Sequence, residues 1–153
     1  MRRFAFSLEK VLELREFERK QAEIELGKAV ATEAELQHAL ELVAGQRVRT
    51  VHAADAMHDL ASLYNAQRYF MLLDQRKETL LEELSQAHLV TEEKRDVMRE
   101  ALKRQKVLEQ LREKRHAAWR KDAQRAEEAA VDDITTGAAV ARTNHTESAH
   151  LLP

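Results

Sequence analysis

The chain has no cysteine and very little glycine, proline or aromatic residue, and these shortages exclude several classes of protein. Its 153 residues include 3 Gly, 1 Pro and no Cys, and aromatic residues make up 5%. Without cysteine there is neither a disulfide framework nor a zinc site built on thiolates. Average usage predicts about 18 Gly and Pro residues together in a chain of this length. Such a shortage leaves too few turn residues for a barrel, a sandwich or a Rossmann sheet.

Long apolar runs are also missing. No segment approaches the ~18 consecutive apolar residues that cross a bilayer, and no apolar stretch of a signal peptide follows the basic Arg2-Arg3 start. We therefore expect a cytoplasmic protein. Apolar residues reach 44%, dispersed among 34% charged residues. This composition is typical of one elongated helical domain and excludes most enzyme folds.

Two stretches carry apolar residues at the alternating spacing of three and four that forms a coiled-coil seam. The first seam runs from Ala22 to Val43 and has Glu33 as its one polar member. The second seam runs from Phe70 to Leu111. The spacing predicts two amphipathic helices, each burying one narrow stripe.

The boundaries follow from composition. Ser7 is a candidate N-cap for the first helix. Thr, Gly and Asn accumulate near the C-terminus, where the periodicity is lost. We predict a helix over about 7–53, a turn over about 54–59, a second helix over about 60–131, and a flexible tail over 132–153.

The two seams also predict which residues face each other. In an antiparallel hairpin, the residue numbers of facing positions have a constant sum. Pairing Leu40 with Leu73 and Glu33 with Leu80 gives a sum of 113 and centres the hairpin within the predicted turn. The predicted fold is therefore all-α, with two long helices forming an antiparallel coiled-coil hairpin. A single seam buries only a small core, which favours a function in binding.

The sequence contains no motif for catalysis, cofactor binding or metal binding. The three glycines are isolated, so no loop cradles a phosphate, and neither HExxH nor a nucleophile elbow occurs. His52, Asp55 and His58 come nearest to a metal-ligand cluster, but their spacing spreads them around a helix, and we interpret them as polar turn residues. We predict a protein that is not an enzyme and has no cofactor.

Basic residues concentrate in the second half of the chain. Residues 99–125 carry a net charge of +6, whereas the whole chain carries −2. The basic residues surround the helix and have Trp119 as their only aromatic neighbour, so nucleic acid is the least favoured partner. An acidic groove of a protein partner and a plain solvated surface are both compatible with this stretch.

Three stretches resemble the bacterial flagellar FliJ family. Residues 3–15, RFAFSLEKVLELR, follow the family pattern F-x-F-x-L-x-x-V-L-x-L-R. Tyr69-Phe70-x-x-Leu73 resembles the aromatic start of the family's second helix. Residues 108–115, LEQLREKR, resemble its L-E-x-L-[KR]-E-[KR]-R stretch. The likeness covers about residues 3–133.

The resemblance implies a soluble, non-enzymatic component of flagellar type III export. Members of the family are similar to the central stalk subunit of rotary ATPases. The resemblance implies an antiparallel coiled coil that inserts into the hexameric export ATPase. The implied partners are this hexamer, the cytoplasmic domain of the membrane export gate, and export chaperones. No nucleic acid is implied, and the membrane is contacted only through the gate. The implied location is cytoplasmic, peripheral to the inner membrane at the flagellar base.

Two contact regions follow from the resemblance and the charge pattern. The end near the termini is expected to bind the export ATPase through Arg15, Leu108, Leu111, Arg112 and Arg115. The end near the turn is expected to bind the export gate through Val48, Tyr69 and Leu73. Two alternatives stay open: the equivalent stalk protein of a virulence injectisome, and a self-associating structural coiled coil.

Overall fold

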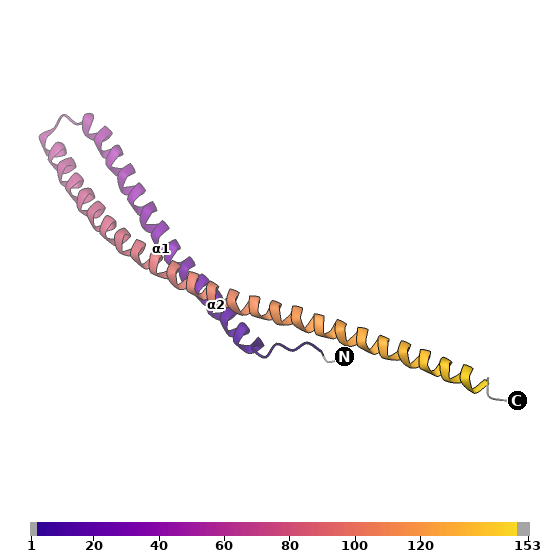
Figure 1. Ribbon diagram of the computed structural model, residues 1–153. Coiled ribbons are helices and arrows are strands. Elements are labelled where there is room, and N and C mark those ends of the chain that lie inside the picture. Colours follow the sequence, from indigo (N-terminus) through magenta and orange to yellow (C-terminus); the bar gives the residue numbers. More distant parts are fainter. Residues whose placement is uncertain (1–2, 150–153) are drawn as a thin grey trace. The chain divides into compact units, whose positions relative to one another are not determined.

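The computed structural model contains two long α-helices joined by a short turn (Figure 1). It describes residues 3–149, and the side chains of residues 3–142. Helix α1 spans Glu9–Asp55 and helix α2 spans Leu60–Ala149, with no strand among the described residues. The prediction of an all-α fold with two long helices packed against each other is confirmed.

Local hydrogen bonds account for the turn between the helices. At the end of α1, the backbone N–H of Ala56 donates to the carbonyl of Ala53 at 3.3 Å, which closes the last helical turn. At the start of α2, Asp59 acts as N-cap, because its Oδ2 accepts a hydrogen bond from the backbone N–H of Ser62 at 3.2 Å. The turn is therefore residues 56–59, slightly shorter than predicted.

Helix α2 continues well beyond its predicted end at about residue 131. The structure is helical through Ala149, so the flexible tail is corrected to helix over 132–149, and residues 150–153 lie outside the described part. No proline occurs before Pro153, and alanine, the best helix former, recurs through this segment. Helix propensity thus extends α2 past the point where the apolar periodicity stops.

The described residues form two compact bodies. The hairpin body is Glu13–Gln105, and the terminal body combines residues 3–12 with residues 106–149. The hairpin body contains most of α1 and the first half of α2. Its buried apolar side chains keep the heptad spacing predicted for the seam. They are Ala22, Ala66, Leu73, Leu80 and Ala101.

Contacts between α1 and α2 in the hairpin body show that the helices are antiparallel. Arg47 forms an ion pair with Asp74, and Nδ1 of His88 lies 3.0 Å from Oε1 of Glu33. The residue numbers of both pairs add to 121 rather than to the predicted 113. The observed register therefore differs from the predicted one by about one heptad.

The predicted pairing of Leu40 with Leu73 and of Glu33 with Leu80 is wrong. A seam with a strict period of seven fits equally well after a slide of seven residues, so the apolar pattern could not choose between these registers. The observed register gives Glu33 a polar partner. The predicted one would have set its carboxylate against an aliphatic side chain, which costs free energy.

Glu33, His88 and Thr91 together form a polar layer in the apolar seam. The Glu33 side chain is only 18% exposed, and Thr91 is fully buried. The Oγ1 of Thr91 donates to the backbone carbonyl of Ala87 at 3.0 Å. The pKa of Glu33 is lowered chiefly by its hydrogen bond with His88, and further by the neighbouring Thr91 side chain. The layer therefore stabilises the ionised carboxylate within the seam.

We expect the Glu33 layer to make the stability of the hairpin body depend on acidic pH. Because the folded-state pKa of Glu33 lies below the ordinary 4.5, ionised Glu33 stabilises the fold above that value. This stabilisation is lost as the pH falls through the lowered pKa. The melting temperature of the wild type should exceed that of Glu33→Gln near neutrality, and the difference should shrink below about pH 4.5. Thermal unfolding followed by circular dichroism measures it, and a difference independent of pH would contradict the assignment.

Candidate protein-binding surfaces

In the terminal body, aromatic contacts hold the segment before α1 against α2. The Phe4 ring centroid lies 5.0 Å from that of His116 and 5.8 Å from that of Trp119. His116 and Trp119 also stack on each other, with centroids 5.8 Å apart. Phe6 is buried, and the guanidinium of Arg115 lies 5.7 Å from its ring centroid. Edge-to-face and tilted aromatic contacts of Phe4, with the cation–π contact of Phe6, thus fix the N-terminal segment in place.

Two arginines expected to contact an ATPase also have partners within the terminal body. Nη1 of Arg115 donates a hydrogen bond to Oγ of Ser7 at 2.8 Å. Nε of Arg112 lies 3.4 Å from Oε2 of Glu9, in a half-exposed ion pair. Ser7, the predicted helix cap, therefore serves as an acceptor for α2. These two arginines have a structural role in addition to any intermolecular role.

The other residues expected at the ATPase divide between the two bodies. Leu108 and Leu111 lie half-buried on α2 in the terminal body. Arg15 belongs to the hairpin body, where its Nη1 donates to Oε2 of Glu18 at 2.7 Å. The terminal body thus brings together Leu108, Leu111, Arg112 and Arg115, and their role in binding stays a prediction.

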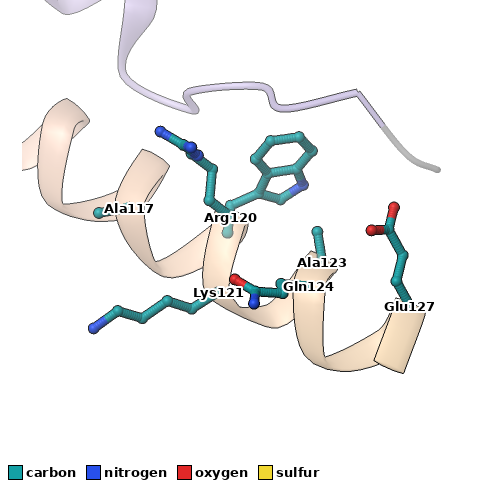
Figure 2. A pocket seen from close by; sticks show the side chains of 7 residues that line it. Ala117, Arg120, Lys121, Ala123, Gln124 and Glu127 are labelled. Carbon is teal, nitrogen blue, oxygen red and sulfur yellow. The ribbon is translucent and has the colours of Figure 1, made fainter. Parts of the chain in front are cut away.

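Two shallow hollows lie on the terminal body. The first measures about 430 Å³ and is lined by Phe4, Glu109, Arg112, Glu113 and His116. The second measures about 560 Å³ (Figure 2) and is lined by Ala117, Trp119, Arg120, Lys121, Ala123, Gln124 and Glu127. In Figure 2 the side chains of Arg120 and Lys121 leave α2 in different directions. Aromatic and arginine side chains, here Phe4, Trp119, Arg112 and Arg120, are residue types enriched at protein–protein interfaces.

The hairpin body has an apolar hollow of about 390 Å³ between α1 and α2. Its lining residues are Leu40, Glu41, Val43, Ala44, Arg47, Leu73, Asp74, Lys77 and Leu81. The Arg47–Asp74 ion pair crosses between the helices within this lining, and the guanidinium of Arg47 lies 5.5 Å from the ring centroid of Phe70. An apolar hollow with charged neighbours suits an apolar side chain of a protein partner.

The residues expected to bind the export gate differ in their accessibility. Val48 and Tyr69 are 56% and 41% exposed, whereas Leu73 is 6% exposed. Leu73 lines the apolar hollow of the hairpin body, so a partner would contact Leu73 only by entering that hollow. Val48 and Tyr69 are the two predicted gate residues that offer exposed surface.

The aromatic cluster and the apolar hollow were not predicted from the sequence. Phe4 and Phe6 directly before the first helix are a signal for packing of the N-terminal segment, similar to a hydrophobic staple. That signal does not name their partners, which lie more than a hundred residues away on α2. The hollow depends on the register of the helices, and the predicted register was displaced by a heptad.

No group of three or more His, Cys, Asp or Glu side chains in the described part of the chain is arranged to hold a metal ion. Among the described residues, neither helix has a stretch apolar enough to span a membrane.

Two long helices packed against each other, with shallow hollows on their surfaces, define an all-α helical hairpin protein. The family model for the flagellar FliJ protein matches residues 4–144. The chain belongs to the FliJ family, which confirms the resemblance seen in the sequence. Membership identifies it as a component related to flagellar export, in a non-enzymatic family. A comparison with curated proteins and another with solved structures gave no match.

Proposed function

We propose that this protein is an assembly component of the flagellar type III export apparatus and activates the hexameric export ATPase as a central stalk. The observation that carries this proposal is the family match over residues 4–144. The antiparallel pairing of α1 and α2, defined by the Arg47–Asp74 and Glu33–His88 contacts, is the architecture that a two-helix stalk requires. The match to the flagellar family also favours the flagellar system over an injectisome.

We place the ATPase contact on the terminal body. Leu108 and Leu111 are half-buried apolar groups beside Arg112 and Arg115, and the net charge over residues 99–125 is +6. Apolar side chains of this kind supply specificity, and the surrounding positive charge accelerates association with an acidic partner. A stalk that turns or shifts against six similar subunits should make few lasting bidentate pairs.

Reconstitution with the purified export ATPase tests the proposed activity. Adding the full chain should raise the rate of ATP hydrolysis and promote assembly of the ATPase ring. Because exposed charges contribute to the contact, stimulation should weaken as the salt concentration rises. An unchanged rate of ATP hydrolysis at every ratio of chain to ATPase contradicts the proposal. Tight self-association without stimulation supports the alternative of a structural coiled coil.

We further propose that the hairpin body contacts the cytoplasmic domain of the export gate through the surface around Tyr69 and Val48. Both side chains are exposed, and the apolar hollow that contains Leu73 belongs to the same body. Export chaperones are proposed as additional partners. The proposed location is the cytoplasm, peripheral to the inner membrane through the export gate.

Tyr69→Ala should weaken binding to the purified cytoplasmic domain of the gate and reduce motility, because it removes an exposed aromatic group that can anchor a partner. The helix content should stay unchanged, since Tyr69 lies outside the buried core. Tyr64→Ala is the matched control, because Tyr64 is also an exposed tyrosine on α2 in the hairpin body. Equal gate binding by the two variants would show that Tyr69 is not a specific contact.

A further inference from the structure

The apolar seam of the hairpin body is compatible with two registers. On α2, Ala66, Leu73 and Leu80 follow one another in steps of seven. On α1, Leu36 and Val43 are also seven residues apart. A slide of seven residues therefore exchanges one apolar neighbour for another, and the aliphatic contacts alone do not select a register.

The polar contacts between α1 and α2 exist in only one of these registers. Glu33 meets His88 at 3.0 Å, and Arg47 meets Asp74. A slide of seven residues moves each partner by about 10 Å along the helix axis, beyond hydrogen-bonding distance. The Glu33 carboxylate would then lie among leucine side chains near position 80, without its polar partners.

The turn does not prevent such a slide. In the observed register, the start of α2 extends about 9 Å beyond the level where α1 ends, because the residue numbers of contacting pairs add to 121. With axes about 10 Å apart, the chain must span about 13 Å. The five peptide steps from Asp55 to Leu60 reach up to about 17 Å. After the slide, the distance between Asp55 and Leu60 is shorter. The same turn can therefore connect α1 and α2 in either register.

We propose that Glu33, His88 and Thr91, together with the Arg47–Asp74 ion pair, act as a register latch in the hairpin body. While the latch is closed, α1 and α2 keep the observed register. When it is released, the helices slide by one heptad and settle on the alternative set of apolar contacts. A single polar residue in a coiled-coil seam is known to specify register, and here the polar residues come from both helices.

The slide would change the surface that a partner meets. The apolar hollow of the hairpin body takes Leu40 and Val43 from α1 and Leu73 from α2, so its walls belong to different helices. After a slide of one heptad, the side chains of α1 that line the hollow would face different side chains of α2. A partner that binds the hollow in one register shifts the equilibrium of the latch toward that register.

Disulfide trapping in the full chain reports the register directly, because the protein has no cysteine of its own. Val43→Cys with Lys77→Cys joins two residues that line the same hollow in the observed register. Leu36→Cys with Lys77→Cys joins residues that face each other only after the slide, since Leu36 borders Glu83 and Ala87 in the observed structure. Each pair is placed in the native background and in a released variant. The released variant carries Glu33→Leu, Thr91→Val and Asp74→Ala. It also carries Arg112→Ala and Arg115→Ala, because their contacts with Glu9 and Ser7 join the start of α1 and the residues before it to α2 in the observed register.

With the latch intact, the 43–77 disulfide should form at least tenfold faster than the 36–77 disulfide. In the released variant, the 36–77 disulfide should form at a rate within about threefold of the 43–77 disulfide. Circular dichroism checks that both backgrounds are equally helical. Exclusive formation of the 43–77 disulfide in a helical released variant would overturn the proposal, as would disulfides that join two chains on a non-reducing gel.

A milder variant covers the case in which the released variant does not fold. Glu9→Gln, Glu33→Gln and Asp74→Asn keep the size of the side chains and remove the negative charge from the pairs that these residues form between α1 and α2. We expect the rate of the 36–77 disulfide to rise at least threefold over the native background. No rise in this conservative variant would also overturn the latch.

Discussion

Replacing Leu80 by alanine should strongly destabilise the hairpin body. Leu80 is 1% exposed and is one of the two largest fully buried side chains, with Thr91 the other. Truncating a buried leucine to alanine costs about 2–5 kcal/mol, because transfer free energy is lost and a cavity remains. Small domains are stabilised by only about 5–15 kcal/mol in total. A hairpin with a single seam has no second layer that could collapse into the space.

The expected result is a melting temperature lower by roughly 10 °C, measured by circular dichroism. Leu72→Ala is the matched control, because Leu72 is an exposed leucine on the same helix. Its effect should stay within about 0.5 kcal/mol. Equal losses at positions 72 and 80 would show that the seam does not hold the hairpin together.

Reversing the charges of Arg112 and Arg115 to glutamate should abolish stimulation of the export ATPase. The two substitutions lower the net charge over residues 99–125 from +6 to +2. A partner with an acidic surface would then be repelled where it had been attracted. We expect ATP hydrolysis to stay at its basal rate and ring assembly to fail, while binding to the gate is kept.

The structure also predicts a local effect of this double variant. Arg112 pairs with Glu9, and Arg115 donates to Ser7, so the reversal loosens the N-terminal segment. Trp119 is the only tryptophan of the chain and contacts Phe4, so its fluorescence reports whether that segment stays in place. Phe4→Ala separates the two effects, because it weakens the aromatic packing without changing charge.

Arg99→Glu with Lys103→Glu is the matched charge control. Both residues belong to the hairpin body and pair locally with Asp96 and Glu100, and their reversal changes the net charge by the same amount. This control should still stimulate the ATPase. If the Arg112/Arg115 double variant stimulates as well as the wild type at physiological salt, the terminal body is not the contact. If Phe4→Ala removes stimulation equally, placement of the N-terminal segment rather than charge is decisive.

Several features of the protein were predictable because they depend on local chemistry. The scarcity of Gly and Pro and the three-four spacing of apolar residues from Ala22 to Val43 predicted two helices and the turn between them. The family resemblance rested on local motifs in both helices, and the family match over residues 4–144 confirmed it. The end of α2 was misplaced, because loss of apolar periodicity marks the end of a seam and not the end of a helix.

The candidate surfaces were less predictable because their residues meet only in the folded chain. The residue types at Arg112 and Arg115 suggested intermolecular contacts, yet Arg112 pairs with Glu9 at the start of α1 and Arg115 with Ser7 just before it. Nothing in the sequence near Phe4 indicates that its neighbours are His116 and Trp119. Such pairs are separated by most of the chain, so local patterns carry no information about them.

The sequence by itself determined the presence of two long helices, the faces that they bury, and the family to which the chain belongs. All three depend on the identity and spacing of residues along one helix. Only the tertiary structure decided the register, and with it the pairing of Glu33 with His88 and the lining of the hollow around Leu73. The physical reason is that aliphatic contacts are non-directional and repeat every seven residues, so they fix which faces meet. Directional polar contacts between the helices fix where along those faces the residues meet.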